Sequence, residues 1–275
     1  MTPLLLALGA SLAWGVADFV GPLLSRTLGV LRIMFWAQVG GLTGIAIVVA
    51  IRGEGPAGWG VLFAVAAAIG GTLGLFAYYR GMQIGAMSVV APIAGASAVI
   101  PVVFGIATGD DPSTPQLAGM ACALVGVALA SVEHQEGSHR LAAGVGLALL
   151  AALGFGIYFP WMHAAGKVDF WWASLIFRTA ALLLVASAVA VARPNLRLSR
   201  RHLAIALAVG LGDMLGNLLF AASSSSGLVS LTAVLASLYP IVTVLLAAAV
   251  LHERVQPLQK TGIVLTLAGV VLISV

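Results

Sequence analysis

Residues 202–222 read HLAIALAVGLGDMLGNLLFAA, and Asp213 is the only acidic residue among them, with no Lys or Arg. A helix needs roughly 20 predominantly apolar residues to cross the hydrocarbon core of a bilayer, where no backbone polar group can stay unpaired. This stretch meets that requirement, so we expect it to cross a membrane as a helix. An acid near the centre of such a helix is costly in lipid, and it therefore indicates a cavity or a partner helix.

The rest of the chain has the same character. Of its 275 residues, 61% are hydrophobic and only 8% are charged, and the mean hydropathy is +1.11. An ordinary soluble domain carries about a quarter charged residues, so a water-soluble fold is excluded. Ten apolar stretches follow one another, at about 3–22, 30–51, 57–80, 85–107, 114–132, 141–163, 169–192, 202–222, 227–250 and 257–275. We predict an all-α membrane protein with ten transmembrane helices, located in the inner membrane.

The two halves of the chain match each other at a nearly constant shift. At a shift of 142, Gly70, Gly74, Gly85, Ser88 and Ala91 fall on Gly212, Gly216, Gly227, Ser230 and Ala233. At 143, Gln116, Gly119, Leu124, Gly126, Val127 and Ser131 fall on Gln259, Gly262, Leu267, Gly269, Val270 and Ser274, and at 141 Trp14 falls on Phe155. These matches predict two five-helix repeats, residues 1–136 and 137–275. Because five is odd, the repeats should be inverted around a central cavity.

Positive charge is distributed unevenly over the predicted loops. Ten basic residues fall on the side opposite the termini: Arg26, Arg32, Arg80, Arg140, Arg193, Arg197, Arg200, Arg201, Arg254 and Lys260. Only Arg52 and Lys167 fall on the side of the termini. The side that is richer in Lys and Arg normally faces the cytoplasm, so this count favours periplasmic termini.

Several functional classes lack the residues that they need. Cys122 is the only cysteine, and Asp110-Asp111 has no second acidic cluster to pair with, so we expect no enzyme, no cofactor and no metal site. The basic residues form no dense patch, which argues against nucleic acid as a partner. No Walker A loop is present, so transport would use a gradient through proton antiport, exchange or facilitated diffusion. A facilitative permease or channel-like protein is the alternative, and the chain is expected to act as a monomer or homodimer.

The residues resemble the drug/metabolite transporter superfamily, EamA type, over nearly the whole chain. The resemblance is carried by Ala13-Trp14-Gly15-Val16 at the start, by Gln116, Gly119 and Gly126 at the end of the first half, and by Pro240, His252-Glu253-Arg254, Gln259-Lys260-Thr261-Gly262 and Gly269-Val270 at the end of the second. Asp110-Asp111 stands where the family glutamate of the first half would be. The resemblance implies an exporter of amino acids, other metabolites or drugs, usually with cytoplasmic termini, in contrast to the charge count.

Three charged residues lie deep inside predicted helices, namely Asp18, Arg178 and Asp213. Such charges usually face a cavity or another helix. In a functional interpretation, one acid carries a coupling proton or holds a substrate amine, and Arg178 binds a carboxylate. In a structural interpretation, Arg178 neutralises Asp213 across adjacent helices. Both interpretations stay open.

Aromatic and polar residues mark the remaining candidate site. Together with the three charges, the predicted substrate-binding residues are Trp14, Tyr78, Tyr79, Phe155, Tyr158, Asn217 and Tyr239. A cavity with aromatic walls and a few hydrogen-bonding groups suits an amphipathic metabolite or an amino acid. We also expect Pro22 to end the first helix and Ser223–Gly227 to form a flexible turn.

Overall fold

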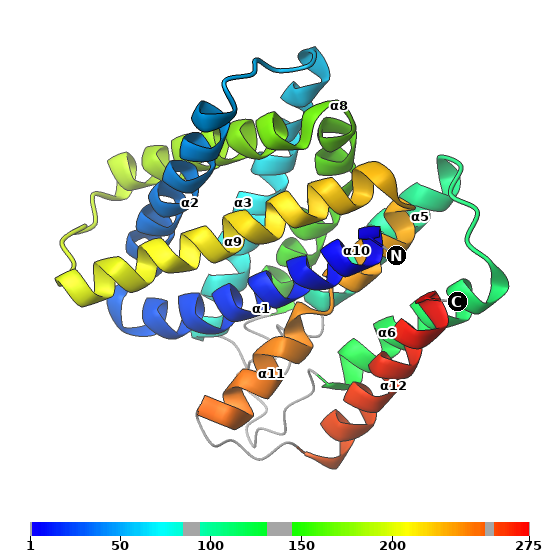
Figure 1. The fold of residues 1–275 in the computed structure, drawn as a ribbon. Coiled ribbons are helices and arrows are strands. Elements are labelled where there is room, and N and C mark those ends of the chain that lie inside the picture. The colour runs from blue at the N-terminus through cyan, green and yellow to red at the C-terminus, as the bar shows by residue number, and fades with distance from the viewer. Residues whose placement is uncertain (1, 85–93, 131–144, 251–255, 275) are drawn as a thin grey trace.

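The computed structural model describes residues 2–84, 94–130, 145–250 and 256–274. Within these ranges the chain is helical and contains no β-strand. The elements are α1 (Thr2–Leu28), α2 (Val30–Arg52), η1 (Trp59–Leu62), α3 (Phe63–Ile84), η2 (Ala96–Ala98), α5 (Val99–Ala107), α6 (Thr114–Ala130), α8 (Val145–Ala192), α9 (Arg200–Ser226), α10 (Val229–Ala236), α11 (Tyr239–Val250) and α12 (Pro257–Ser274) (Figure 1). Several residues used above lie outside the described ranges, namely Gly85, Ser88, Ala91, Ser131, Arg140, His252, Glu253 and Arg254, together with the predicted repeat boundary between residues 136 and 137.

Helix α8 consists of two helices that meet at Asp169. This residue has extended backbone angles, φ −164° and ψ 105°. Its carboxylate accepts hydrogen bonds from the backbone N–H of Trp171 (3.0 Å) and of Trp172 (3.2 Å), and thereby caps the second helix. A continuous helix of 48 residues would be about 72 Å long, more than twice the thickness of a bilayer core. The break at Asp169 agrees with the predicted separation between segments 141–163 and 169–192.

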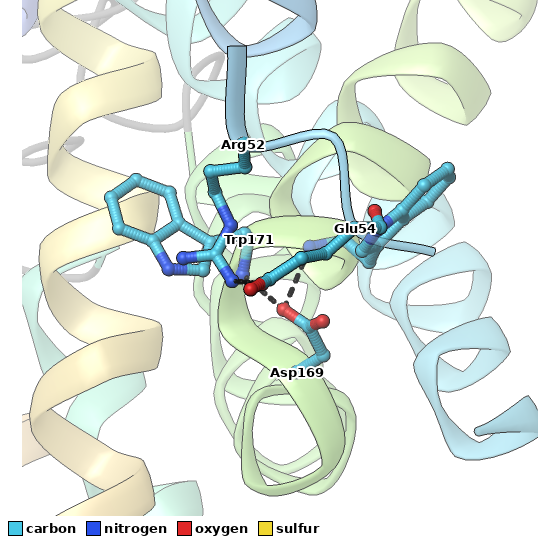
Figure 2. Close-up of polar contacts among 5 residues, drawn as sticks. Arg52, Glu54, Asp169 and Trp171 are labelled. Carbon is cyan, nitrogen blue, oxygen red and sulfur yellow. Dashed lines mark hydrogen bonds and ion pairs between the residues drawn. The ribbon is translucent and has the colours of Figure 1, made fainter. Parts of the chain in front are cut away.

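The loop that follows α2 lies against this break (Figure 2). The guanidinium of Arg52 lies 5.0 Å from the centre of the Trp171 ring and forms an ion pair with Glu54. Trp172 Nε1 donates to the backbone carbonyl of Glu54 at 2.9 Å. These contacts join the end of α2 to the start of the second helix of α8, at a place where polar groups are exposed.

Seven helices within the described residues are long and apolar enough to cross a membrane, and the helix that contains Asp169 is one of them. Two shorter apolar helices cover Ala96–Ala107 and Thr114–Leu129. Described helical residues fall within each of the ten predicted segments. The number of crossings, ten, stays a prediction.

Two local expectations are wrong. Pro22 lies inside α1, which continues to Leu28, and the Ser25 hydroxyl donates to the Pro22 carbonyl at 2.9 Å. Neighbouring helices tolerate a proline in a membrane helix because other groups can satisfy the freed backbone. Residues 223–226 form the last turn of α9 instead of a flexible turn. Their hydroxyls donate to backbone carbonyls, and that of Ser223 bonds Pro3 O at 2.6 Å, so the serines are compatible with a buried helix end.

Two groups of helices can be followed in Figure 1. Helices α1, α2, α3, α8 and α9 cross one another in the main bundle, whereas α6 and α12 lie side by side at its edge. Both chain ends lie on the same side of the molecule, next to the loop between α5 and α6. Asp110 in that loop accepts a hydrogen bond from the backbone N–H of Ser230 at 2.7 Å and so caps α10.

The α6–α12 pair is held by glycines that match in the two repeats. A methyl group on Gly119 would lie 2.7 Å from the Gly269 carbonyl oxygen, and one on Gly126 would lie 2.7 Å from that of Gly262. Gly119 corresponds to Gly262 and Gly126 to Gly269 at the shift of 143, so each contact is the exchanged form of the other. Reciprocal contacts of this kind are what a two-fold relation between the halves requires, and only glycine allows the two backbones to approach so closely.

The same exchange occurs in the main bundle. Gly216 of α9 packs on the ring of Trp14 in α1, and Gly74 of α3 packs on the ring of Phe155 in α8, where an added methyl would lie 2.9 Å from Phe155 Cδ1. Gly74 corresponds to Gly216 and Trp14 to Phe155. The sequence repeat is therefore also a repeat of contacts.

Candidate functional site

A cavity with an empty volume of about 550 Å³, including the part open to solvent, lies between the helices of the main bundle. Within the part of the chain that the structure describes, its walls are formed by Trp14, Asp18, Gln38, Gly71, Thr72, Leu75, Ser97, Phe155, Tyr158, Phe159, Phe177, Asp213, Asn217 and Tyr239. Most of these residues lie well inside α1, α2, α3, α8 and α9, whereas Ser97 lies in η2 and Tyr239 begins α11.

Seven of the ten predicted site residues line this cavity. They are Trp14, Asp18, Phe155, Tyr158, Asp213, Asn217 and Tyr239. Three do not line it, namely Tyr78, Tyr79 and Arg178. The structure thus brings residues from both halves of the chain to one site, and it places three predicted binding residues behind the wall.

Arg178 lies behind Asp213 and belongs to a buried ion pair. Its side chain is 1% exposed, and Nη1 donates to Asp213 Oδ2 at 2.7 Å and to Gln38 Oε1 at 2.9 Å. Asp213 is 22% exposed and reaches the cavity. The geometry supports the structural interpretation, in which Arg178 neutralises Asp213 across neighbouring helices. Breaking such a pair would leave an uncompensated charge in the bundle.

Asp18 differs from Asp213 in having no cation beside it. Its side chain lines the cavity, and it forms neither a hydrogen bond nor an ion pair with the residues that the structure describes. Trp14 lies one helical turn before it on the same face of α1. Asp18 is therefore the acidic group of the cavity that is free to contact a ligand.

Trp14 is the centre of an aromatic cluster on one wall. Its ring centroid lies 5.9 Å from that of Tyr158, 6.1 Å from Phe159, 6.2 Å from Phe220 and 6.5 Å from Tyr239. Most of these pairs meet edge to face, the arrangement that aromatic rings prefer. The cluster combines α1, α8, α9 and α11 into one apolar surface beside Asp18.

Four hydroxyl groups of the lining have no hydrogen-bond partner among the described residues. They belong to Thr72, Ser97, Tyr158 and Tyr239, each of which is at least nine-tenths buried. A buried hydroxyl without a partner costs free energy, and such groups need an explanation. A polar ligand in the cavity would satisfy them.

Tyr78 and Tyr79 support the cavity from outside. The ring of Tyr78 lies 6.0 Å from that of Phe155, and the Tyr79 hydroxyl lies against Gly21 of α1. The pair Phe155–Tyr78 is the repeat counterpart of the pair Trp14–Phe220, because Phe220 follows Tyr78 by 142 residues. Each aromatic pair therefore joins the two halves, and each is the exchanged form of the other.

Sequence reasoning missed half of the lining, namely Gln38, Gly71, Thr72, Leu75, Ser97, Phe159 and Phe177. The repeat contains the signal for four of these seven. Shifting Asp18 by 141 reaches Phe159, and shifting Tyr239, Asp213 and Asn217 back by 142 reaches Ser97, Gly71 and Leu75. Apolar residues such as Leu75 have no functional group that would single them out in the sequence, so only the repeat symmetry identifies them as lining residues.

The described residues form an all-α protein with several helices apolar enough to cross a membrane and a cavity lined by both halves of the chain. The profile of the EamA-like transporter family matches the chain twice, over residues 1–132 and 142–275. The chain belongs to the EamA-like transporter family, and so to the drug/metabolite transporter type that the sequence resembles. The repeat boundary between residues 136 and 137 stays a prediction.

Solved structures give further support for the fold. A crystal structure described only as that of a protein is similar to the chain with a TM-score of 0.76 and 18% identity, covering 98% of this chain and 95% of the other. A comparison with curated proteins finds none that matches. No group of three or more His, Cys, Asp or Glu side chains that could hold a metal ion occurs among the described residues.

Proposed function

We propose that this chain is a secondary-active transporter that exports a small organic metabolite, amino acid-like or drug-like, through the central cavity by alternating access. In this proposal the chain crosses the inner membrane ten times as two inverted five-helix repeats. The observation that carries it is the mid-bundle cavity, where Asp18 and four buried hydroxyls lack partners within the described residues. The polar contacts of the substrate are Asp18, Asp213, Asn217 and Tyr239, with Arg178 holding Asp213 in place.

The reciprocal contacts between the halves support the transport mechanism. An inverted pair of repeats can adopt two arrangements of one architecture, open to opposite faces of the membrane. The contacts Trp14–Gly216 and Phe155–Gly74 are exchanged forms of each other, and Trp14 and Phe155 both line the cavity. The break at Asp169 supports the count of ten, because it divides the longest helix into two lengths that each suit one crossing.

The proposal is tested by blocking the cavity. A panel of amino acids, amines and cationic dyes is first screened by thermal shift in detergent, and the most stabilising compound is then used for counterflow in proteoliposomes. Ser97 lines the cavity from η2, the short helix directly before α5. Ser97→Phe should fill the cavity and abolish saturable counterflow. Val99→Phe, two residues on and 48% exposed on the outer surface, is the matched control and should leave flux unchanged. Full flux in Ser97→Phe would exclude the cavity as the pathway.

Coupling to protons is a separate part of the proposal. A carboxylate that binds the substrate and a proton in turn would couple the two, and Asp18 is the first candidate because it has no cation beside it. We expect Asp18→Asn to lose the pH dependence of flux, with Asp213→Asn tested beside it. Retention of full pH-dependent flux in both variants would remove proton coupling and leave exchange or facilitated diffusion.

A further inference from the structure

We propose that the cavity selects a monovalent organic amine with an aromatic or other apolar body, and that it discriminates against the amino acid and the carboxylate of the same shape. This inference rests on the proposed function and specifies its substrate class. It follows from the charges, hydrogen-bond acceptors and aromatic faces that a ligand would meet in the cavity.

The charges that a ligand would meet are negative. Asp18 and Asp213 both line the cavity, and no Lys or Arg does so among the residues described. Arg178 is the nearest cation, but it is 1% exposed and already bound to Asp213 and Gln38. The pair Arg178–Asp213 is neutral as a whole, and a cationic ligand beside Asp18 would favour the ionised form of this acid and pair with it. A ligand carboxylate would find no accessible cation in the lining, because Arg178 lies behind it with its Nε and Nη2 atoms buried.

Hydrogen-bond acceptors gather around Asp18. Pro22 has no backbone N–H, so the Asp18 carbonyl lacks the donor that it would have in a regular helix. The same residue therefore contributes a carboxylate without a described partner and a carbonyl without its i+4 donor. On the neighbouring helix α9, Asn217 Nδ2 donates to the Asp213 carbonyl at 2.9 Å, which leaves Asn217 Oδ1 as an acceptor. A protonated amine has only donors to offer, and it matches this set of acceptors.

The apolar part of the ligand would meet aromatic rings. Trp14 lies one turn from Asp18 on α1, and its ring contacts those of Tyr158 and Tyr239. Electron-rich ring faces attract a desolvated cation, Trp most strongly, so they favour an ammonium group held at the carboxylate. In the repeat the position of Asp18 is occupied by Phe159, so the second half supplies an apolar ring where the first half supplies the acid. A molecule with a charged end and an aromatic end fits that division.

The test compares four probes of one shape: phenethylamine, L-phenylalanine, 3-phenylpropionate and 2-phenylethanol. Equilibrium binding to the full chain in detergent is followed by tryptophan fluorescence and checked by calorimetry. Phenethylamine should bind at least tenfold more tightly than each of the other three. Equal or tighter binding of L-phenylalanine or 3-phenylpropionate would overturn the inference, as would the absence of phenethylamine binding.

Variants of the acid identify the group responsible. Asp18→Asn should weaken phenethylamine at least tenfold and leave 2-phenylethanol unchanged, whereas Asp18→Glu should keep the preference for the amine. Glu54→Gln removes an acid that is 67% exposed at the end of α2 and serves as the matched control. An unchanged amine preference in Asp18→Asn would overturn the inference.

Binding and flux separate this inference from the proposed function. Amine-selective binding without saturable flux in proteoliposomes would support the substrate class and refute transport. Saturable flux of L-phenylalanine without any preference for the amine would support transport and refute the substrate class.

Discussion

The two halves of the chain are alike where they pack on each other and unlike where they face the cavity. At the α6–α12 contact the matched positions are identical: Gly119 matches Gly262, and Gly126 matches Gly269. The contacts cross between these matches, because Gly119 meets Gly269 and Gly126 meets Gly262. At the cavity the matched positions Trp14 and Phe155 are both aromatic, but four other matched pairs differ in chemistry: Asp18 and Phe159, Asp213 and Gly71, Asn217 and Leu75, Tyr239 and Ser97.

This difference has a physical cause. Close packing of two helices constrains both partners equally, because backbone atoms must approach on each side, so the repeat keeps its small residues. A small ligand has no two-fold symmetry, and its charged and apolar ends need different groups on the two walls. The predictions below test this division between a symmetric framework and an asymmetric site.

The largest effect is expected for the buried ion pair. Arg178→Gln leaves Asp213 without its cation and should lower the free energy of unfolding by about 3 kcal/mol, measured by denaturation in mixed micelles. The double variant Arg178→Gln with Asp213→Asn should recover most of the loss. Asp18→Asn, which removes a carboxylate without a described partner, should cause no loss. If Arg178→Gln lowered the free energy of unfolding no more than Asp18→Asn does, the assignment of Arg178 as the structural partner of Asp213 would be contradicted.

A smaller effect is expected for the symmetric framework. Gly126→Val places a side chain against the Gly262 carbonyl and should destabilise the chain by about 1–3 kcal/mol. Gly119→Val should have a similar effect, since it makes the exchanged contact. Gly146→Ala is the control, because an added methyl there meets no atom within 4 Å and helix propensity favours Ala. Unequal effects of the two valines, differing several-fold, would argue against equivalent contacts.

At the asymmetric site, a substitution can make one half resemble the other. Asn217→Leu copies the first-half residue Leu75 and removes one hydrogen-bonding group from the cavity. A hydrogen bond contributes about 1 kcal/mol, so substrate affinity should fall about fivefold, and the free energy of unfolding should fall by a similar amount because Asn217 Nδ2 donates to the Asp213 carbonyl. Titration of the best ligand from the thermal-shift screen measures the change. Unaltered affinity would mean that the Asn217 side chain does not touch the ligand.

The smallest effect is expected at the end of α2. Glu54→Gln removes the partner of Arg52 in an ion pair whose acid is 67% exposed, and exposed pairs contribute about 0.5 kcal/mol or less. Unfolding in the same micelles should show a change within that range. If Glu54→Gln lowered the free energy of unfolding as much as Arg178→Gln does, the exposed Arg52–Glu54 pair would matter as much to stability as the buried pair, contrary to this expectation.

Several features could be read from the residues alone. Apolar length identified a helical membrane protein, and the shifts of 141–143 identified the repeat that the family profile also divides into residues 1–132 and 142–275. Asp18, Asp213 and Trp14 line the cavity, and their role in substrate binding stays a prediction. The membrane helices and the repeat could be inferred because hydropathy and spacing are properties of each segment along the chain.

The direction of each side chain required the folded bundle. Arg178 and Gln38 are 140 residues apart and meet because α2 and α8 pack together, so no local pattern could show that the guanidinium turns away from the cavity. The roles of Ser97 and Thr72, and the continuation of α1 past Pro22, depend on neighbours in the same way. How a helix is rotated about its own axis is set by the helices that it contacts, and that rotation decides which of its residues a ligand can reach.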